Sequence, residues 1–316
     1  MTIAFTFPGQ GSQHVGMGAD LAATYESARG VFEEVDDALG QKLSQIAWEG
    51  PEDTLTLTEN AQPALMAVSL AAYRVLELEK GISIKDTAKF VAGHSLGEYS
   101  ALAAAGALSV ADTARLLKVR GKSMQAAVPV GEGAMAALLG LELPDAQKLA
   151  EAAAEADVCQ AANDNAPGQV VISGSKAAVE RAVELAPEYG ARRAVLLPVS
   201  APFHCALMQP AAEAMAEALA DVDIKPPAVP LIANVVAGEV TEPEDIRARL
   251  VEQVTGAVRW RESVMYMAGA GVTTLYEIGA GRVLTGLARR IERSLEANSV
   301  GTPEEVEAAA EKLGSA

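Results

Sequence analysis

A serine with glycines two residues before it and two residues after it is the strongest chemical signal in this chain. The residues are Gly93-His94-Ser95-Leu96-Gly97. This spacing is typical of a nucleophile elbow, a sharp strand-to-helix turn that exposes the serine hydroxyl and needs small residues on both sides. A helix that begins beside the serine favours developing negative charge. Ser95 is our candidate nucleophile; the alternative is a turn in which Ser95 only caps the helix.

The residues around Ser95 predict the two elements that such a turn joins. The apolar run from Phe90 to Ala92 is typical of a buried strand, and an Ala- and Leu-rich segment from Leu96 to near Gly106 predicts a helix. This strand–turn–helix context makes the glycine–serine–glycine spacing more specific than the spacing alone.

A serine nucleophile needs a base within hydrogen-bond distance, and the chain has three histidines. His94 adjoins Ser95, and side chains of neighbours on a sharp turn point apart. His204 follows Pro202 on a loop that could approach the serine from another part of the fold. We therefore favour His204 as the base and keep His14 as the alternative. A loop or core histidine without a catalytic partner is the simplest explanation for either.

A loop with two glycines, Pro8 to His14, follows the apolar segment from Ile3 to Phe7, which predicts a buried strand. Such a loop can bring backbone N–H groups close to an anion or an oxyanion. Taken alone, a tight strand-to-helix turn explains it more simply.

The helical segment from Ala111 to Ala127 carries four cations, Arg115, Lys118, Arg120 and Lys122. A solvated basic face is the usual explanation for such a group. We accept it for three of the four and consider Arg120 separately below.

Composition limits the class of protein. Hydrophobic residues make up 50% of the 316 residues and charged residues 21%, as in a globular protein. The formal net charge of −17 argues against nucleic acid and anionic membrane as partners. No apolar run reaches the roughly 18 residues of a membrane span. The first residues have no basic region and predict a strand, so we expect no signal peptide. Cys159 and Cys205 give neither a disulfide framework nor metal-ligand spacing, and we therefore expect a cytoplasmic protein.

The order of predicted elements indicates an α/β fold with an insertion. Between residues 129 and 198 the pattern is β-α-β-β-α-β, which is the order of a ferredoxin-like unit. We predict a large α/β-hydrolase-like domain with a parallel sheet, formed by 1–128 and 199–316, and an inserted subdomain at 129–198. Within the insertion, residues 163–168 predict a turn whose asparagines form Asx turns. In the large domain, Pro63 is expected at the first position of a long helix.

Four motifs in register resemble one family. They are Phe7-Pro8-Gly9-Gln10-Gly11-Ser12-Gln13, Gly93-His94-Ser95-Leu96-Gly97-Glu98-Tyr99, Arg120-Gly121-Lys122-Ser123-Met124-Gln125 and Pro202-Phe203-His204. Their order and spacing are similar to those of malonyl-CoA:acyl-carrier-protein transacylases, which load malonate in type II fatty-acid synthesis. The resemblance extends from the first strand to about Leu287. The one departure we see is Arg282, where the family usually has lysine.

The resemblance implies roles for named residues. Ser95 would be the nucleophile and His204 its base, with the backbone carbonyl of Gln253 orienting the histidine. The backbone N–H groups of Gln10 and Leu96 would form the oxyanion hole.

Two further residues would bind the acyl group. Arg120 would hold the free carboxylate of malonate, a role that suits a planar guanidinium with paired donors. An acyl group without that carboxylate would leave a buried arginine unpaired, which would disfavour acetyl. Phe203 would limit the room for an α-methyl branch.

The implied reaction is ping-pong transfer of malonyl from malonyl-CoA to Ser95 and then to the phosphopantetheine thiol of acyl carrier protein. It needs no cofactor and no metal, and we expect a monomer. Because carrier proteins of this kind are acidic, a local basic patch should meet them. Our candidates for it are Lys122, Arg192, Arg193, Arg282, Arg289 and Arg290.

Three other functions remain open at this point. A serine thioesterase or esterase shares the serine and base but usually adds a carboxylate and needs no buried arginine. A non-catalytic carrier-binding module would make the serine, histidine and arginine incidental. The same enzyme could also serve a polyketide pathway, although a small stand-alone chain favours fatty-acid synthesis.

Overall fold

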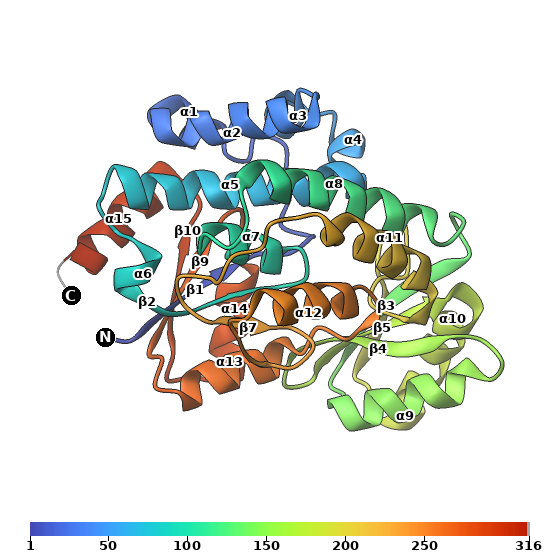
Figure 1. The fold of residues 1–316 in the computed structure, drawn as a ribbon. Helices are drawn as coiled ribbons and strands as arrows, with labels where there is room; N and C mark the ends of the chain where they lie inside the picture. The colour runs from blue at the N-terminus through green and yellow to red at the C-terminus, as the bar shows by residue number, and fades with distance from the viewer. Residues whose placement is uncertain (315–316) are drawn as a thin grey trace.

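A six-stranded sheet forms the centre of the larger part of the molecule (Figure 1). The computed structural model describes residues 1–314. The strand order is β10-β9-β1-β2-β7-β8, and all neighbours are parallel except β7 and β8. The sheet is therefore mixed rather than parallel throughout. Its strands are β1 (Ile3–Phe7), β2 (Ala88–Gly93), β7 (Leu231–Ala233), β8 (Gly238–Val240), β9 (Thr274–Ile278) and β10 (Glu296–Val300).

Helices cover both faces of this sheet, because alternate residues of its buried strands point to opposite sides. Phe5 and Phe7 belong to one hydrophobic cluster, with residues of α2, α5 and α8, whereas Ala4 and Phe90 belong to another, with residues of α13 and α14. The helices are α1 (Ala19–Thr24), α2 (Glu26–Leu39), α3 (Leu43–Glu49), α4 (Glu52–Thr56), α5 (Thr58–Leu78), α6 (Ile84–Thr87), α7 (Gly97–Ala104), α8 (Val110–Ala126), α11 (Gln209–Ala220), α12 (Pro243–Thr255), α13 (Trp260–Gly269), α14 (Val283–Ile291) and α15 (Pro303–Gly314). No helix among residues 1–314 is long and apolar enough to cross a membrane.

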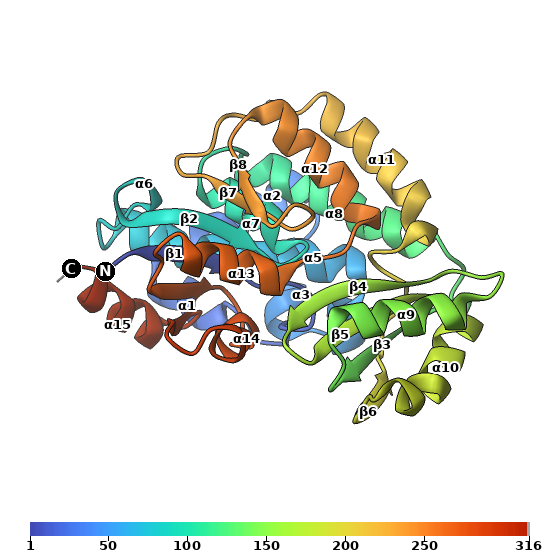
Figure 2. The ribbon, with the colours of Figure 1, turned by 90° about the horizontal axis from the view of Figure 1, so that it is seen from below.

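The segment that the sequence predicts as β-α-β-β-α-β is present, and its strands form a separate antiparallel sheet (Figure 2). Its order is β4-β5-β3-β6, and a third hydrophobic cluster lies between its strands and two helices. Because this part has its own hydrophobic cluster, we propose that the chain divides into a large domain and an inserted subdomain near residues 128 and 198. The elements are β3 (Gly133–Leu139), α9 (Leu143–Ala154), β4 (Cys159–Ala166), β5 (Gln169–Ser175), α10 (Lys176–Leu185) and β6 (Arg193–Leu196), with short 3₁₀ turns at Ala186–Tyr189 and, after the segment, Ala206–Met208.

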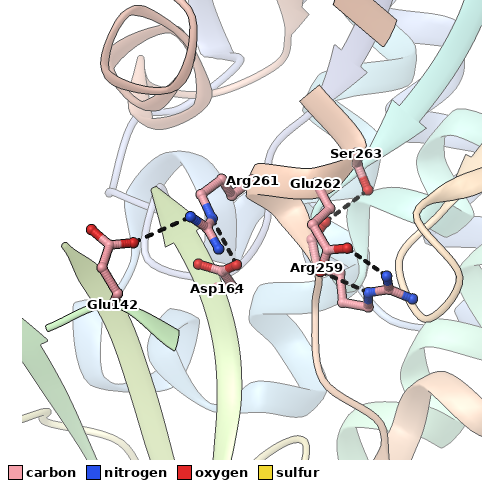
Figure 3. A network of polar contacts seen from close by, with 6 residues as sticks. All are labelled: Glu142, Asp164, Arg259, Arg261, Glu262 and Ser263. Atoms are coloured by element: carbon pink, nitrogen blue, oxygen red, sulfur yellow. Dashed lines mark hydrogen bonds and ion pairs between the residues drawn. The ribbon is translucent and has the colours of Figure 1, made fainter. Parts of the chain in front are cut away.

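Polar contacts from α13 join this smaller sheet to the rest of the chain (Figure 3). The guanidinium of Arg261 lies 2.9 Å from the buried carboxylate of Asp164 on β4 and 3.2 Å from that of Glu142 before α9. Backbone bonds continue the attachment, since the Asp164 N–H donates to the carbonyl of Val258 at 2.9 Å. The end of β4 is thereby attached to α13 and to the segment before it.

Two local predictions are wrong. Pro63 is not at the start of its helix, because α5 begins at Thr58. The early turns of α5 pack closely on α8, where a Cβ at Gly121 would lie 2.5 Å from the Cα of Glu59, and this tertiary contact extends the helix. The turn predicted over residues 163–168 is also too long. Asn163 and Asp164 pair with β5 as strand residues, and the chain reverses at residues 167–168 alone.

Candidate active site

The turn that carries Ser95 lies between β2 and α7, and its glycines are there because no side chain would fit. A Cβ at Gly93 would lie 1.9 Å from the carbonyl carbon of Gly97, and a Cβ at Gly97 would lie 2.2 Å from the carbonyl oxygen of Phe7. Ser95 itself has a φ of 54°, in the left-handed region that L-residues seldom adopt. Such strain is typical of functional sites and persists only where neighbours hold it in place.

The structure brings His204 to this serine from a position 109 residues further along the chain. The Oγ of Ser95 and the Nε2 of His204 are 2.8 Å apart. The Nδ1 of His204 lies 2.9 Å from the carbonyl oxygen of Gln253 and 3.2 Å from that of Gly256. Because carbonyl oxygens only accept, Nδ1 carries the hydrogen, and Nε2 is left to accept the serine proton. The arrangement is a dyad oriented by backbone carbonyls.

The charge state of His204 suits a base. Burial, followed by the positive charge of Arg120, lowers the pKa of His204 to about 3. The imidazole is therefore neutral at physiological pH and can take a proton from Ser95. The other two histidines are not placed for this task. The Nε2 of His94 lies 2.9 Å from the Oδ1 of Asn165, and the Nδ1 of His14 contacts the carbonyl oxygen of Ser12 at 3.3 Å.

Arg120 is the most deeply buried of the four cations on α8, and only 1% of it is exposed, whereas the side chain of Lys118 is 17% exposed. Its Nη2 donates to the Oγ of Ser95 at 3.1 Å and to the Oε1 of Gln253 at 2.8 Å, and its Nη1 donates to the Oε1 of Gln62 at 2.8 Å. Its Nε has no hydrogen-bond partner among residues 1–314. Among residues 1–314, no carboxylate forms a hydrogen bond or ion pair with this guanidinium, so a buried positive charge lies beside the candidate nucleophile without a directly bound anion.

The amides of Gln10 and Leu96, which the resemblance assigns to an oxyanion hole, lie in the turns that follow β1 and β2. Strand β1 lies parallel to β2, with Phe7 opposite Gly93, so the loop after β1 reaches the same sheet edge as Ser95. Within the part of the chain that the structure describes, neither the N–H of Gln10 nor that of Leu96 donates to a protein group. Gln10 also lines a surface cavity of about 730 Å³, whose other walls are residues 51–53, 56–57 and 198–200.

Three polar residues that sequence reasoning did not select join this cluster. Gln62 contacts Arg120, while Asn234 and Glu98 support the serine turn, as described below. Glu98 directly follows Gly97, and a carboxyl in so apolar a helix was the one signal that could have marked it. Phe203, which the resemblance places near the acyl group, is 9% exposed and packs in the main hydrophobic cluster.

Comparison with known proteins shows the family of this chain. Residues 4–307 match the family model described as the acyl transferase domain. The chain is 49% identical to the malonyl CoA-acyl carrier protein transacylase of Bacillus subtilis (strain 168) over 312 residues, which are 98% of this chain and 97% of that protein.

Two solved structures are similar over nearly the whole chain. The acyl-carrier-protein-S-malonyltransferase of Bartonella henselae has 61% identity and a TM-score of 0.97, covering 99% of this chain and 100% of that one. A malonyl-transacylase solved in complex with a type II polyketide synthase acyl-carrier protein has 43% identity and a TM-score of 0.95, covering 99% of this chain and 100% of that one. This chain therefore belongs to the acyl transferase domain family and, within it, to the malonyl-CoA:acyl-carrier-protein transacylases.

Proposed function

We propose that this enzyme transfers the malonyl group of malonyl-CoA to the phosphopantetheine thiol of acyl carrier protein, supplying malonyl-carrier protein for fatty-acid synthesis. The observation that carries this proposal is the 3.1 Å between the Nη2 of Arg120 and the Oγ of Ser95. In a malonyl thioester, one methylene separates the reactive carbonyl carbon from the free carboxylate. A group that binds the carboxylate must therefore lie next to the nucleophile, as Arg120 does.

In the first half-reaction, the turn acts as a nucleophile elbow. The Oγ of Ser95 attacks the thioester carbonyl while its proton passes to the Nε2 of His204. The oxyanion that forms accepts hydrogen bonds from the amides of Gln10 and Leu96. When the tetrahedral intermediate collapses, the carbon–sulfur bond breaks and His204 returns the proton to the leaving CoA thiolate.

The second half-reaction reverses these steps with a different thiol. The phosphopantetheine thiol of the carrier gives its proton to His204 and attacks the malonyl ester of Ser95. The serine leaves and recovers the proton. Throughout, Arg120 stays paired with the malonyl carboxylate, while Phe203 restricts space for a branch beside it.

Exposed cations offer the acidic carrier a docking surface. Arg192, Arg193 and Arg290 are exposed, and Arg282 is 73% exposed although it also contacts Glu305. We propose that the carrier docks on these residues together with Lys122 and Arg289, a set of cations that we call the basic patch.

Mass spectrometry of the intact protein after mixing with malonyl-CoA tests the proposal. We expect a malonyl adduct on the wild type, little adduct with acetyl-CoA, and none on Ser95→Ala. Release of free malonate without an adduct or transfer to a thiol would identify a thioesterase instead.

A further inference from the structure

One buried carboxyl group close to the active site has no part in the chemistry described above. Glu98 lies on α7, three residues after Ser95, and is fully buried. Burial raises the pKa of Glu98 to about 7, even though bonds from Gln253 and Asn234 and the charge of Arg120 lower it. Burying a carboxyl group costs free energy unless hydrogen bonds within the protein replace its bonds to water, so the partners of Glu98 are of interest.

A single oxygen of Glu98 accepts two hydrogen bonds. Its Oε2 lies 3.0 Å from the backbone nitrogen of Asn234 and 3.0 Å from the Nε2 of Gln253. Its Oε1 has no partner among residues 1–314. The carboxyl thus joins two segments, the end of β7 and α12, to the helix that follows the serine.

Both of those residues hold the backbone of the serine turn. The Oδ1 of Asn234 accepts from the N–H of Ser95 at 2.8 Å, and its Nδ2 donates to the carbonyl of Gly93 at 2.7 Å. The Nε2 of Gln253 donates to the carbonyl of Ser95 at 3.0 Å. The two main-chain polar groups of Ser95 are therefore bound by two amide side chains, and Glu98 supports both of the residues that carry them.

This scaffold also bears on the rest of the site. Because the N–H of Ser95 is bound to Asn234, it is not free to bind the oxyanion, which leaves Leu96 as the donor from this turn. Gln253 also contacts the candidate base and the candidate carboxylate-binding residue. Its backbone carbonyl accepts a hydrogen bond from His204, and its Oε1 accepts one from Arg120. A shift of the Gln253 side chain would therefore move Ser95 and Arg120 relative to each other.

We propose that Glu98 and Asn234 are positioning residues for acyl transfer. They act through hydrogen bonds that hold Ser95 in its left-handed conformation and hold Gln253 between Ser95, His204 and Arg120. Neither residue touches the reacting atoms. The inference rests on the proposed function, because it concerns the serine that we propose as nucleophile.

The unpartnered oxygen of Glu98 allows a sharp pair of variants. In Glu98→Gln, the amide oxygen can keep both accepted bonds while the NH₂ takes the place of Oε1, so the hydrogen bonds survive and the side chain can no longer ionise. In Glu98→Ala, both donors lose their acceptor. Since misplacing reacting groups by about 1 Å can slow a reaction on the order of 100-fold, we expect Glu98→Ala to lose about that factor in the acylation rate. The acylation rate of Glu98→Gln should fall about threefold at most, because this variant keeps the hydrogen bonds to Asn234 and Gln253.

The assay is the single-turnover rate of malonyl-Ser95 formation, followed by quenched-flow and intact mass at several malonyl-CoA concentrations. A positioning role predicts that the limiting rate falls in Glu98→Ala while the half-saturating concentration changes less than about threefold. Ser100→Ala is the matched control, because Ser100 is equally buried on α7 and its hydroxyl has no partner among residues 1–314. It should acylate at the wild-type rate.

Each outcome decides the question. Thermal unfolding is measured for every variant, and rates are compared well below each midpoint. If Glu98→Ala is not folded, Asn234→Ala takes its place, with the same expected loss. A folded Glu98→Ala or Asn234→Ala that acylates at the wild-type rate, or a Glu98→Gln as slow as Glu98→Ala, would overturn the inference. Failure of the wild type itself to form malonyl-serine would refute the proposed function instead.

Discussion

Replacing Arg120 should change which acyl group the enzyme accepts more than it changes acyl transfer in general. In the structure, the guanidinium of Arg120 donates hydrogen bonds to Gln62 and Gln253, and its third hydrogen bond, from Nη2, goes to the Oγ of Ser95. A malonyl carboxylate would take that donor and the unpartnered Nε. Arg120→Ala removes these contacts and keeps the serine–histidine pair.

The magnitude follows from two charge-assisted hydrogen bonds. Each contributes about 1.5–3 kcal/mol, so their loss corresponds to roughly 3–6 kcal/mol, or about 10²- to 10⁴-fold in the acylation efficiency with malonyl-CoA. Acetyl-CoA makes neither bond, so its efficiency should change less than about tenfold. Arg120→Lys should resemble Arg120→Ala, because one ammonium group cannot reach Gln62, Gln253 and the substrate in the guanidinium's geometry.

The assay compares single-turnover adduct formation with malonyl-CoA, acetyl-CoA and succinyl-CoA. Succinyl carries its carboxylate one methylene further from the carbonyl, so wild-type enzyme should acylate poorly with it. Arg115→Ala is the matched control, since Arg115 lies on the same helix but its side chain is 57% exposed. An Arg120→Ala enzyme that keeps the malonyl-to-acetyl preference of the wild type would refute the carboxylate-binding role.

Three further predictions concern the base, the acyl pocket and the carrier. Because burial and Arg120 lower the pKa of His204 to about 3, the base stays neutral as the pH falls through its ordinary value of about 6.5. The acylation rate should therefore change less than about threefold between about pH 5.5 and 8, and a tenfold fall centred near 6.5 would contradict this state. Phe203→Ala should raise methylmalonyl adduct formation relative to malonyl by about tenfold, measured as competing adduct masses, because it removes bulk where a branch would lie. Raising the salt concentration to about 1 M shortens the Debye length to about 3 Å, so it should slow malonyl transfer to carrier protein more than transfer to free pantetheine. Equal slowing of both reactions would exclude the basic patch as the docking surface.

Local sequence patterns predicted the elements whose signals are local. The turn at Ser95 follows from glycines that the backbone packing requires, and the β-α-β-β-α-β order follows from alternating strand and helix patterns. The predictions at Pro63 and at residues 163–168 were wrong because packing on α8 and pairing with β5 outweighed local propensity. The edge strand β10, whose run Glu296–Val300 is largely polar, was missed for lack of an apolar pattern.

The choice among the histidines shows where sequence reasoning ends. Residue type and motif order favoured His204, but only the fold places its ring 2.8 Å from Ser95 and sets two carbonyl oxygens behind it. The same holds for Arg120, which is buried although the helix that carries it has several charged residues, as a surface helix does. The exposure of Arg115 and Lys122 could be inferred from the pattern of the helix. The prediction was wrong for Lys118, whose side chain is 17% exposed and contacts Glu59, because burial on this helix depends on what packs over it.

The amino-acid sequence by itself determined which residues have the chemistry for acyl transfer, because nucleophile, base and carboxylate-binding cation are properties of residue types in motifs. The tertiary structure decided how they act together. Gln62, Glu98, Asn234 and Gln253 come from four distant segments, and no periodicity relates them. They meet because parallel strands end at one sheet edge and helices pack over it, and a buried polar group is stable only where that packing supplies its partners.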